Sequence, residues 1–250
     1  MIFYFSATGN SYHAANRLQN VFSGAVYNIG DCLDHMDFNF QLEKNEKLIF
    51  VFPLYFWGIP TIVEAFLKQV TFYPEEEINV IMTCGGTIGG ADRYFSKLLK
   101  KKGFRIIKIY ELVMETNYII LHTVDEIEIQ QFKLKRAEET LGNIIESIKN
   151  QGESYHSSSW MGCKSKIIYQ LYLHGRNTKY FYTSDRCISC GKCERECPIH
   201  IIKMQQNKPK WIQKKCVHCL RCLSNCPTGA IEYGRWTIGK ERYHYPQSME

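Results

Sequence analysis

The chain of 250 residues lacks any hydrophobic run long enough to cross a membrane. Its longest uncharged stretch, Leu48 to Val63, falls short of the roughly 20 residues that span a bilayer, and Pro53, Gly58 and Pro60 interrupt it. The N-terminus also lacks the basic segment and the cleavage site of a signal peptide. We therefore expect a cytoplasmic protein with no membrane partner.

A surplus of charge is also lacking over most of the chain. Residues 1–180 hold 19 Lys and Arg against 19 Asp and Glu, residues 181–235 hold 10 against 4, and residues 236–250 hold 2 of each. The net charge of +6 therefore arises in residues 181–235. This segment has no recognisable motif for reading nucleic acid, and a metal group bound by thiolates would offset its charge, so we expect no nucleic-acid partner.

Cysteines are abundant in the same segment. The chain has 11 of them, and because nothing indicates secretion, we do not expect a disulfide framework. Eight form two copies of the spacing C-x2-C-x2-C-x3-C-P, and the second copy follows the first by 29 residues, which makes the segment an internal repeat. The two sets are Cys187, Cys190, Cys193 and Cys197, and Cys216, Cys219, Cys222 and Cys226.

This spacing is typical of [4Fe–4S] clusters. Three cysteines on a tight loop can bind three irons of one cluster, whereas the fourth cysteine leaves with its proline and binds the other cluster. A zinc ribbon is the alternative, but it needs only two CxxC pairs and leaves the third and fourth cysteines of each copy unexplained. The predicted ligand sets are Cys187, Cys190, Cys193 and Cys226 for one cluster, and Cys216, Cys219, Cys222 and Cys197 for the other.

Over about residues 181–235 the chain resembles the bacterial two-cluster ferredoxin module. Each predicted cluster has four cysteine ligands and no vacant corner, so we expect electron transfer rather than chemistry at iron. His218 lies between two predicted ligands and is expected to be a partly exposed side chain with no ligand role. Cys32 and Cys163 are expected to be ordinary thiols.

Strands and helices are predicted to alternate through the first 150 residues. Apolar residues at helical spacing, such as Ala14, Leu18 and Val21, separate the strand-like runs. The alternation predicts a parallel sheet covered on both faces, with ligands beyond the carboxyl ends of its strands. The five strand-like runs are Met1–Phe5, Ala25–Ile29, Lys47–Pro53, Ile78–Thr83 and Arg105–Val113.

Three loops at these strand ends favour a bound cofactor. The first, Ser6 to Ser11, offers hydroxyl groups and backbone amides at the start of a helix, which suit a phosphate. It has neither the lysine of a Walker loop nor the glycines of G-x-G-x-x-G, so a monophosphate is favoured. The aromatic loop Pro53–Gly58 is typical of core as well as of a cofactor wall, and the glycine-rich loop after Thr83 allows backbone amides to approach a flat ligand.

Together these loops resemble those of flavodoxin, over about residues 1–150. The resemblance implies a five-stranded parallel sheet in the order 2-1-3-4-5 and an FMN cofactor. It assigns the FMN phosphate to Ser6, Thr8, Gly9, Asn10 and Ser11. It assigns the isoalloxazine ring to Pro53, Leu54, Tyr55, Phe56, Trp57, Gly58, Thr83, Cys84, Gly85 and Gly86, with a further contact from Asn117 and Tyr118. At Cys84 the backbone N–H is expected to matter more than the sulfur.

The whole chain resembles the single-chain flavodoxin/ferredoxin fusion proteins of anaerobic prokaryotes. This implies an α/β domain at residues 1–150, a linker or docking segment at 151–180, a small α+β two-cluster domain at 181–235 and a tail at 236–250. Because the segment 151–180 is rich in aromatic residues, we expect it to pack the two domains together rather than to form a free tether.

This combination predicts a protein that passes electrons between FMN and two [4Fe–4S] clusters, and so converts two-electron flow into one-electron flow. Its expected partners are redox proteins of low potential. One alternative is an FMN-dependent reductase of a small molecule such as a quinone or a nitro compound. Another is a structural or regulatory protein with an empty flavodoxin-like domain. The oligomeric state stays open, a homo-oligomer included.

Trp57 lies in the loop that the resemblance assigns to the flavin ring. Trp57→Ala should shift the reduction potential of the flavin or weaken its retention, because the ring loses an aromatic neighbour. Iron content should not change, since the substitution lies far from the cysteines in sequence. FMN, iron and the flavin potential can be measured on one preparation. Equal FMN content with unchanged redox behaviour would remove Trp57 from the site.

Overall fold

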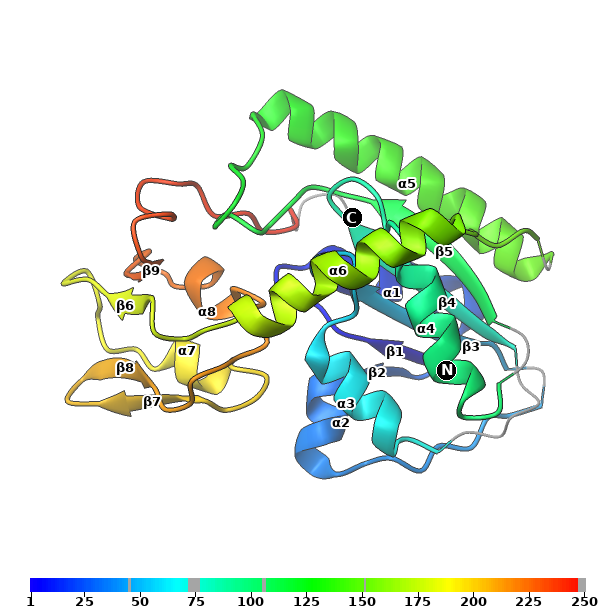
Figure 1. The fold of residues 1–250 in the computed structure, drawn as a ribbon, viewed down its shortest axis with the longest axis horizontal. Coiled ribbons are helices and arrows are strands. Elements are labelled where there is room, and N and C mark those ends of the chain that lie inside the picture. Colours follow the sequence, from blue (N-terminus) through cyan, green and yellow to red (C-terminus); the bar gives the residue numbers. More distant parts are fainter. Residues whose placement is uncertain (45, 72–76, 105–106, 151, 247–250) are drawn as a thin grey trace.

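The computed structural model describes residues 1–44, 46–71, 77–104, 107–150 and 152–246 (Figure 1). Its parallel sheet has five strands in the order β2-β1-β3-β4-β5, which confirms the predicted order. Arg105, where the fifth strand was predicted to begin, lies outside the described residues. The strands are β1 (Ile2–Tyr4), β2 (Val26–Asn28), β3 (Leu48–Pro53), β4 (Ile78–Cys84) and β5 (Ile107–Val113).

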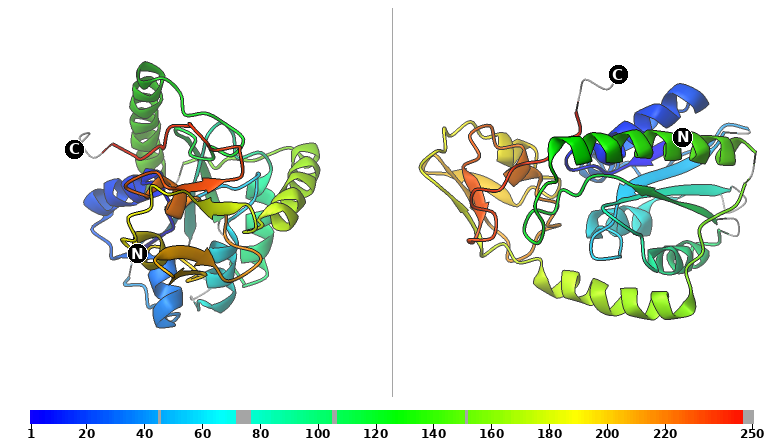
Figure 2. Two further views of the ribbon diagram at one scale, coloured as in Figure 1. Left: turned by 90° about the vertical axis from the view of Figure 1, so that its left-hand side faces the viewer. Right: turned by 90° about the horizontal axis from the view of Figure 1, so that it is seen from above.

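Helices cover both faces of the sheet. Neighbouring strand residues point to opposite sides, so that Phe50 joins one core while Ile49 and Val51 join the other. Burial on both sides explains why the strands read as nearly continuous apolar runs. Helices α1 (Asn10–Phe22) and α5 (Ile127–Lys149) lie on one face, and α2 (Ile29–His35), α3 (Thr61–Gln69) and α4 (Ala91–Lys100) lie on the other (Figure 2).

The end of the second strand differs from the prediction. The strand predicted over Ala25–Ile29 stops at Asn28, whose side chain accepts a hydrogen bond from the Gly30 N–H (2.9 Å) and caps α2. The sequence did not predict α2. Its 7 residues are too few to show a clear helical period.

The cysteine-rich unit is built from two small antiparallel pairs and two short helices. The turn of the second pair, Gln206–Asn207, has positive φ at both residues, as a type I′ hairpin requires. The core of this unit includes Ile119 and Ile120 from the chain after β5, so it packs directly on the first unit. The elements are β6 (Phe181–Thr183) with β9 (Ile231–Tyr233), β7 (Ile202–Gln205) with β8 (Lys208–Trp211), α7 (Lys192–Arg195) and α8 (Arg221–Ser224).

Helix α6 (Ser159–Gly175) fills much of the segment between the two units. It begins at Ser158, whose side chain accepts a hydrogen bond from the Met161 N–H (3.2 Å). The Tyr169 hydroxyl donates to the Ile59 carbonyl (2.8 Å), and the Tyr172 hydroxyl donates to the Val217 carbonyl (2.7 Å). Helix α6 therefore contacts the first unit and a cysteine loop at the same time.

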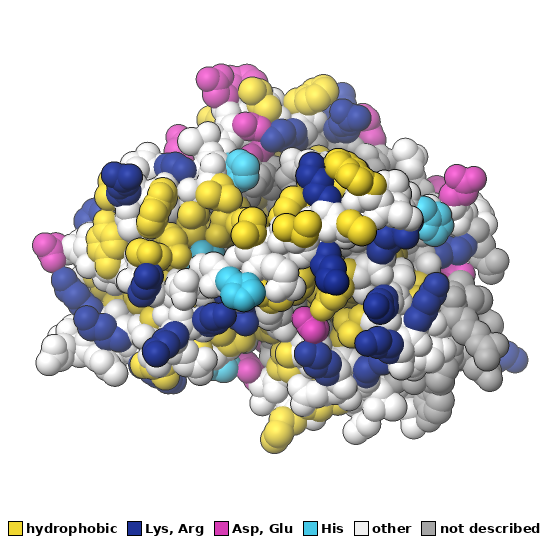
Figure 3. Space-filling model, viewed as in Figure 1, with side chains coloured by type: hydrophobic (Ala, Val, Ile, Leu, Met, Phe, Trp, Pro, Cys, Tyr) yellow, Lys and Arg dark blue, Asp and Glu magenta, His cyan; other side chains and the backbone are white. Residues whose placement is uncertain are grey.

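The outer surface of α6 mixes cations with apolar side chains (Figure 3). The helix carries Lys164 and Lys166 and no acidic residue, and Trp160, Ile167 and Leu171 are each more than 60% exposed. Among the helices of the described residues, none is long and apolar enough to span a bilayer.

Gly58 lies directly beneath α6. A Cβ at this position would lie 2.0 Å from Cδ2 of Tyr169. Gly58→Ala should therefore force the ring outward and lower the free energy of unfolding by about 1–3 kcal/mol, which thermal denaturation would detect as a Tm lower by several degrees.

Gly142→Ala in α5 is the matched control, because apart from its chain neighbours and the backbone of its own helix no atom lies within 4 Å of the added Cβ. This variant should raise Tm slightly, since alanine favours helix over glycine. An unchanged Tm in Gly58→Ala would show that the Tyr169 contact does not restrain α6.

Candidate functional site

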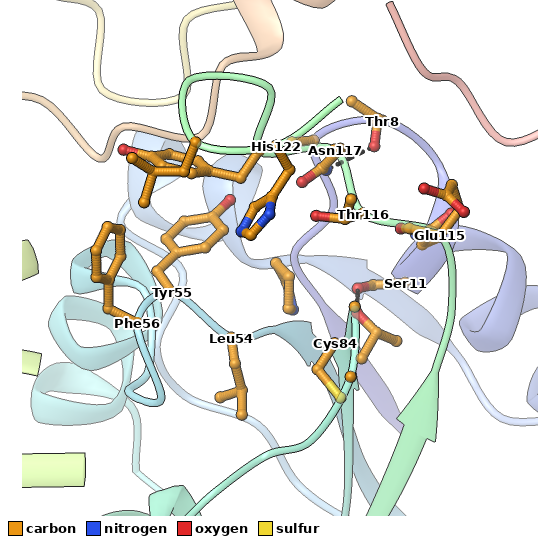
Figure 4. A pocket seen from close by; sticks show the side chains of 18 of the residues that line it. Thr8, Ser11, Leu54, Tyr55, Phe56, Cys84, Glu115, Thr116, Asn117 and His122 are labelled. Carbon is orange, nitrogen blue, oxygen red and sulfur yellow. Dashed lines mark hydrogen bonds between the residues drawn. The ribbon is translucent and has the colours of Figure 1, made fainter. Parts of the chain in front are cut away.

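A cavity of about 840 Å³ opens at the carboxyl ends of the parallel strands (Figure 4). The three loops singled out from the sequence form its walls. Of the residues predicted to bind FMN, only Gly9 and Gly58 do not line it. Those that do are Ser6, Thr8, Asn10, Ser11, Pro53, Leu54, Tyr55, Phe56, Trp57, Thr83, Cys84, Gly85, Gly86 and Tyr118, together with Asn117.

Buried hydroxyl groups gather where α1 begins. Ser11 Oγ lies 2.8 Å from Thr83 Oγ1, and the Asn117 side-chain amide donates to Thr8 Oγ1 (2.7 Å). Because Thr8 accepts in that bond, its own O–H remains for another acceptor. With the first N–H groups of α1, these hydroxyls form a site suited to a phosphate.

The C-terminal tail closes over the outside of this loop. The Tyr245 N–H donates to the Thr8 carbonyl (2.8 Å), and the Tyr243 hydroxyl donates to Asn10 Oδ1 (2.8 Å). Gly9 has a φ of +109°, and a Cβ there would lie 2.6 Å from the Tyr245 Cβ. Gly9 is therefore required by its backbone angle and by the close approach of the tail.

Two buried polar atoms on the cavity wall have no hydrogen-bond partner among the described residues, the Tyr55 hydroxyl and Glu115 Oε1. The second Glu115 oxygen accepts from Lys133 Nζ (3.0 Å), which also pairs with Asp125. Burial raises the pKa of Tyr55 well above its usual value, so its hydroxyl stays protonated. A ligand with both hydroxyl groups and polar ring atoms would satisfy the two atoms, and FMN has both.

Part of the cavity wall was not predicted from the sequence. The missed residues belong mainly to the chain after β5, and one comes from the tail. A signal existed for the first group, because loops after parallel strands gather at the same edge of the sheet. Figure 4 shows the His122 imidazole pointing into the cavity beside Tyr55. The missed residues are Ala7, Thr87, Glu115, Thr116, Leu121, His122, Thr123, Asp125, Lys133 and Lys240.

Trp57 lies at the edge of the cavity next to α6. Its indole packs so closely on Gly89 that a Cβ there would lie 2.7 Å from the ring, and Lys164 Nζ lies 5.4 Å from its centroid. Trp57 has a φ of +55°, and so the loop holds it in a left-handed conformation. These contacts fix the position of the indole from the α6 side.

The eight repeated cysteines gather around two smaller cavities. We call the cavity lined by Cys187, Cys190, Cys193 and Cys226 the outer cavity, and the one lined by Cys197, Cys216, Cys219 and Cys222 the inner cavity. This grouping matches the two sets that the spacing predicts, although ligation itself stays a prediction. Within the described part of the chain, no three or more His, Cys, Asp or Glu side chains are arranged to hold a metal ion. Ligands of a four-iron cluster lie farther apart than ligands of one zinc ion, whose bonds to sulfur are about 2.3 Å long.

Both cysteine loops have the same unusual backbone. Three positions in each copy adopt left-handed angles, and the two sets of positions are separated by 29 residues. Such residues turn neighbouring N–H groups toward a concave side, which suits a negatively charged cluster. The residues are Ser189, Gly191 and His200 in the first copy, and His218, Leu220 and Gly229 in the second.

His218 is buried, with 4% of its surface exposed, so the expectation of a partly exposed side chain was wrong. The ring is enclosed by Phe181, Tyr233 and Tyr118, whose centroids lie 5.7, 4.9 and 5.8 Å away. Burial, aided by the positive charge of Arg176, lowers the pKa of His218 to about 4. The imidazole is therefore neutral at physiological pH.

The inner cavity adjoins the large cavity. Tyr118, which lines the large cavity, has its hydroxyl 2.8 Å from His218 Nδ1. Arg221, between Cys219 and Cys222, donates a hydrogen bond to the Ser6 carbonyl in the first loop. In the loop of the outer cavity, by contrast, Cys190 is exposed, and Ile188 has 63% of its surface exposed.

Two family models match the chain. A 4Fe-4S dicluster domain matches residues 179–243, and a flavodoxin domain matches residues 1–139, more than half of the sequence. The chain belongs to the flavodoxin domain family. No curated protein matches it.

Several solved structures are similar to parts of this flavodoxin-family chain. A "putative flavoprotein" from Bacteroides uniformis ATCC 8492 has 14% identity and a TM-score of 0.34, covering 53% of this chain and 95% of its own. One from Bacteroides eggerthii DSM 20697 has 18% identity and a TM-score of 0.32, covering 43% and 85%. The Flv1 flavodiiron core from Synechocystis sp. PCC6803 has 16% identity and a TM-score of 0.32, covering 60% and 36%. With TM-scores this low, family membership depends on the two domain models alone.

The two domain matches imply FMN and [4Fe–4S] clusters as the cofactors, and so decide against the zinc ribbon. The fold is a flavodoxin-like α/β domain joined to a small cluster domain. The residues present fit these groups. The large cavity has buried hydroxyl groups at the start of α1 and unpaired polar atoms on its wall. Each cysteine cavity has four sulfurs and a loop with left-handed residues.

Gly86 gives a direct test of the large cavity. It lines the cavity, and a Cβ there would meet no protein atom within 4 Å, so an added side chain would enter space that a ligand needs. Gly86→Val should raise the dissociation constant for FMN by roughly tenfold or more, measured by titrating the FMN-depleted protein. Iron content and Tm should stay at the values of the parent protein. An unchanged affinity would place FMN away from this loop.

Proposed function

We propose that this protein transfers electrons between FMN and two [4Fe–4S] clusters, and so links two-electron with one-electron redox reactions in anaerobic metabolism. The contact of the inner cysteine loop with the wall of the large cavity, through Tyr118–His218 and Arg221–Ser6, carries the proposal. When bound, FMN can exchange electrons in pairs or singly, whereas each cluster exchanges one.

In this proposal the first loop holds the FMN phosphate. Thr8 and Ser11 donate their hydroxyls, and the N-terminus of α1 supplies backbone N–H groups and a favourable dipole. Lys133 lies on the cavity wall and offsets the negative charge of Glu115, which would otherwise disfavour an anion there. The loops at Pro53–Gly58 and Thr83–Gly86 hold the isoalloxazine ring and exclude water from it.

The two clusters have different tasks. The set Cys197, Cys216, Cys219 and Cys222 holds its cluster in a buried site beside the flavin. The set Cys187, Cys190, Cys193 and Cys226 holds the other cluster near the surface, where the exposed Ile188 and Cys190 form the face for a redox protein of low potential. The positive charge of residues 181–235 favours a partner with an acidic surface.

One observation favours a second candidate function, the reduction of a small molecule such as a quinone or a nitro compound at FMN. The His122 imidazole points into the cavity beside Tyr55, where it is placed to supply a proton to a reduced acceptor (Figure 4). Turnover of a small acceptor that falls in His122→Ala without loss of FMN would select this function.

The decisive experiment is an anaerobic redox titration of the purified protein, with FMN, iron and sulfide measured on the same sample. We expect about one FMN and about eight irons per chain. After rapid reduction of the clusters, the flavin absorbance should bleach without a further reductant. A flavin that stays oxidised while the clusters stay reduced, despite a favourable potential difference, would overturn the proposal. Absence of FMN from the anaerobically purified protein would favour a structural role.

A further inference from the structure

We propose that Tyr118 and His218 form a positioning pair, in which a residue of the FMN cavity fixes the imidazole that borders the inner cluster and so sets the potential of that cluster. The inference depends on the electron-transfer function proposed above. It gives Tyr118 a role beyond its expected contact with the flavin, and it gives a role to His218, which is not an expected ligand. Neither residue gains or loses a proton in this role.

The pair spans the wall between the two cavities. Tyr118 lines the large cavity, and its hydroxyl lies 2.8 Å from His218 Nδ1. His218 lines the inner cavity, and its backbone N–H donates to Cys216 Sγ (3.2 Å). One side chain thus connects the flavin site to the histidine, and the histidine is part of the loop that holds the inner cysteines.

The hydrogen bond determines which ring nitrogen carries the proton. Burial raises the pKa of Tyr118, so its hydroxyl keeps its proton, and among the described residues His218 Nδ1 is the acceptor placed to receive that O–H. A neutral imidazole that accepts this bond at Nδ1 has its proton on Nε2. The tyrosine therefore selects one tautomer of His218.

Nε2 of His218 is the available donor. It is buried and has no hydrogen-bond partner among the residues that the structure describes. A buried N–H without an acceptor is costly, and the inner cavity that His218 lines is where sulfur acceptors would be. Hydrogen bonds to cluster or cysteine sulfur stabilise the extra negative charge of the reduced cluster and raise its potential.

The surrounding rings hold the pair in place without competing for it. Phe181 and Tyr233 pack edge-on against the His218 ring, at 5.7 and 4.9 Å between centroids. The Tyr233 hydroxyl donates to the Asn177 carbonyl (3.2 Å) and not to His218. Among the described residues, Tyr118 is thus the one side chain whose hydrogen bond to the imidazole can select its tautomer.

Tyr118→Phe removes the hydroxyl and keeps the ring. The potential of one cluster should fall, because the imidazole is no longer held as an Nε2–H donor, while the potential of the other cluster should not change. Tyr233→Phe is the matched control, since it removes a hydroxyl from a ring that also touches His218 but is bonded elsewhere. Both potentials should be followed by electron paramagnetic resonance during an anaerobic titration with dithionite, in which each cluster gains one electron and the pair keeps its protons.

A double-mutant cycle makes the test sharper. His218→Leu should lower the same potential, and Tyr118→Phe should add no further shift in the His218→Leu background, because the tyrosine acts through the histidine. FMN and iron content should be measured for each variant. If the Tyr118→Phe variant does not retain FMN, its cluster potentials should be compared with those of the FMN-depleted parent protein. The potential of the one cluster should still be lower in the variant.

Wild-type potentials for both clusters in Tyr118→Phe, with iron intact, would overturn the inference. An equal shift in Tyr233→Phe would overturn it as well, because the effect would then reflect packing. Neither result would affect the proposed function, which fails if the parent protein lacks FMN or if its clusters and flavin do not exchange electrons.

Discussion

The rest of the molecule depends on how one seven-residue cysteine loop, residues 216–222, packs against the flavodoxin-type unit. Five side-chain hydrogen bonds join the loop to other parts of the chain, and three of them connect it to helix α6 or to the flavodoxin-type unit. The Tyr172 hydroxyl of α6 donates to the Val217 carbonyl. The Tyr118 hydroxyl is hydrogen-bonded to His218 Nδ1, and the Arg221 guanidinium donates to the Ser6 carbonyl. Each bond is buried or partly buried, so its loss would leave a polar group without water. The loop is thereby held against the wall of the large cavity, where FMN is predicted to bind.

Two segments without cofactor motifs, helix α6 and the C-terminal tail, pack on the outside of the cavity loops and the cysteine loop. Helix α6 packs Tyr169 over Gly58 and Tyr172 against the cysteine loop. The tail returns past the cysteine-rich unit to the first loop, where Tyr245 packs on Gly9. One segment thus supports the loop that is predicted to hold the isoalloxazine ring, and the other supports the loop that is predicted to hold the phosphate. Packing of this kind favours a fixed relation between the two units over a flexible tether.

Much of the fold could be predicted from the sequence because its signals are local and periodic. The five apolar runs predicted the strands to within one or two residues where the structure describes them, and the cysteine spacing predicted how eight side chains divide between two cavities. Nearly all the residues taken from the flavodoxin resemblance do line the large cavity. What each of them binds stays a prediction.

The rest depends on contacts between residues far apart in sequence. Burial of His218 results from rings at Tyr118, Phe181 and Tyr233, and no local pattern around the histidine indicates them. Lys240 reaches the cavity only because the tail folds back and its Nζ donates to the Ile119 and His122 carbonyls. Helix α2 was missed for a different reason, since its 7 residues are too few to show a clear helical period. Tertiary contacts and caps of this kind cannot be inferred from apolar periodicity.

The repeat relates the two cysteine loops by pseudo-symmetry, and this relation equates Ile188 with Val217, 29 residues later. Val217 is 2% exposed under Tyr172, whereas Ile188 is 63% exposed. The module therefore has two equivalent apolar positions, one covered by its own chain and one left open to solvent. In the module without α6 both positions would face water, so α6 removes from solvent an apolar side chain that the pseudo-symmetry alone would leave exposed.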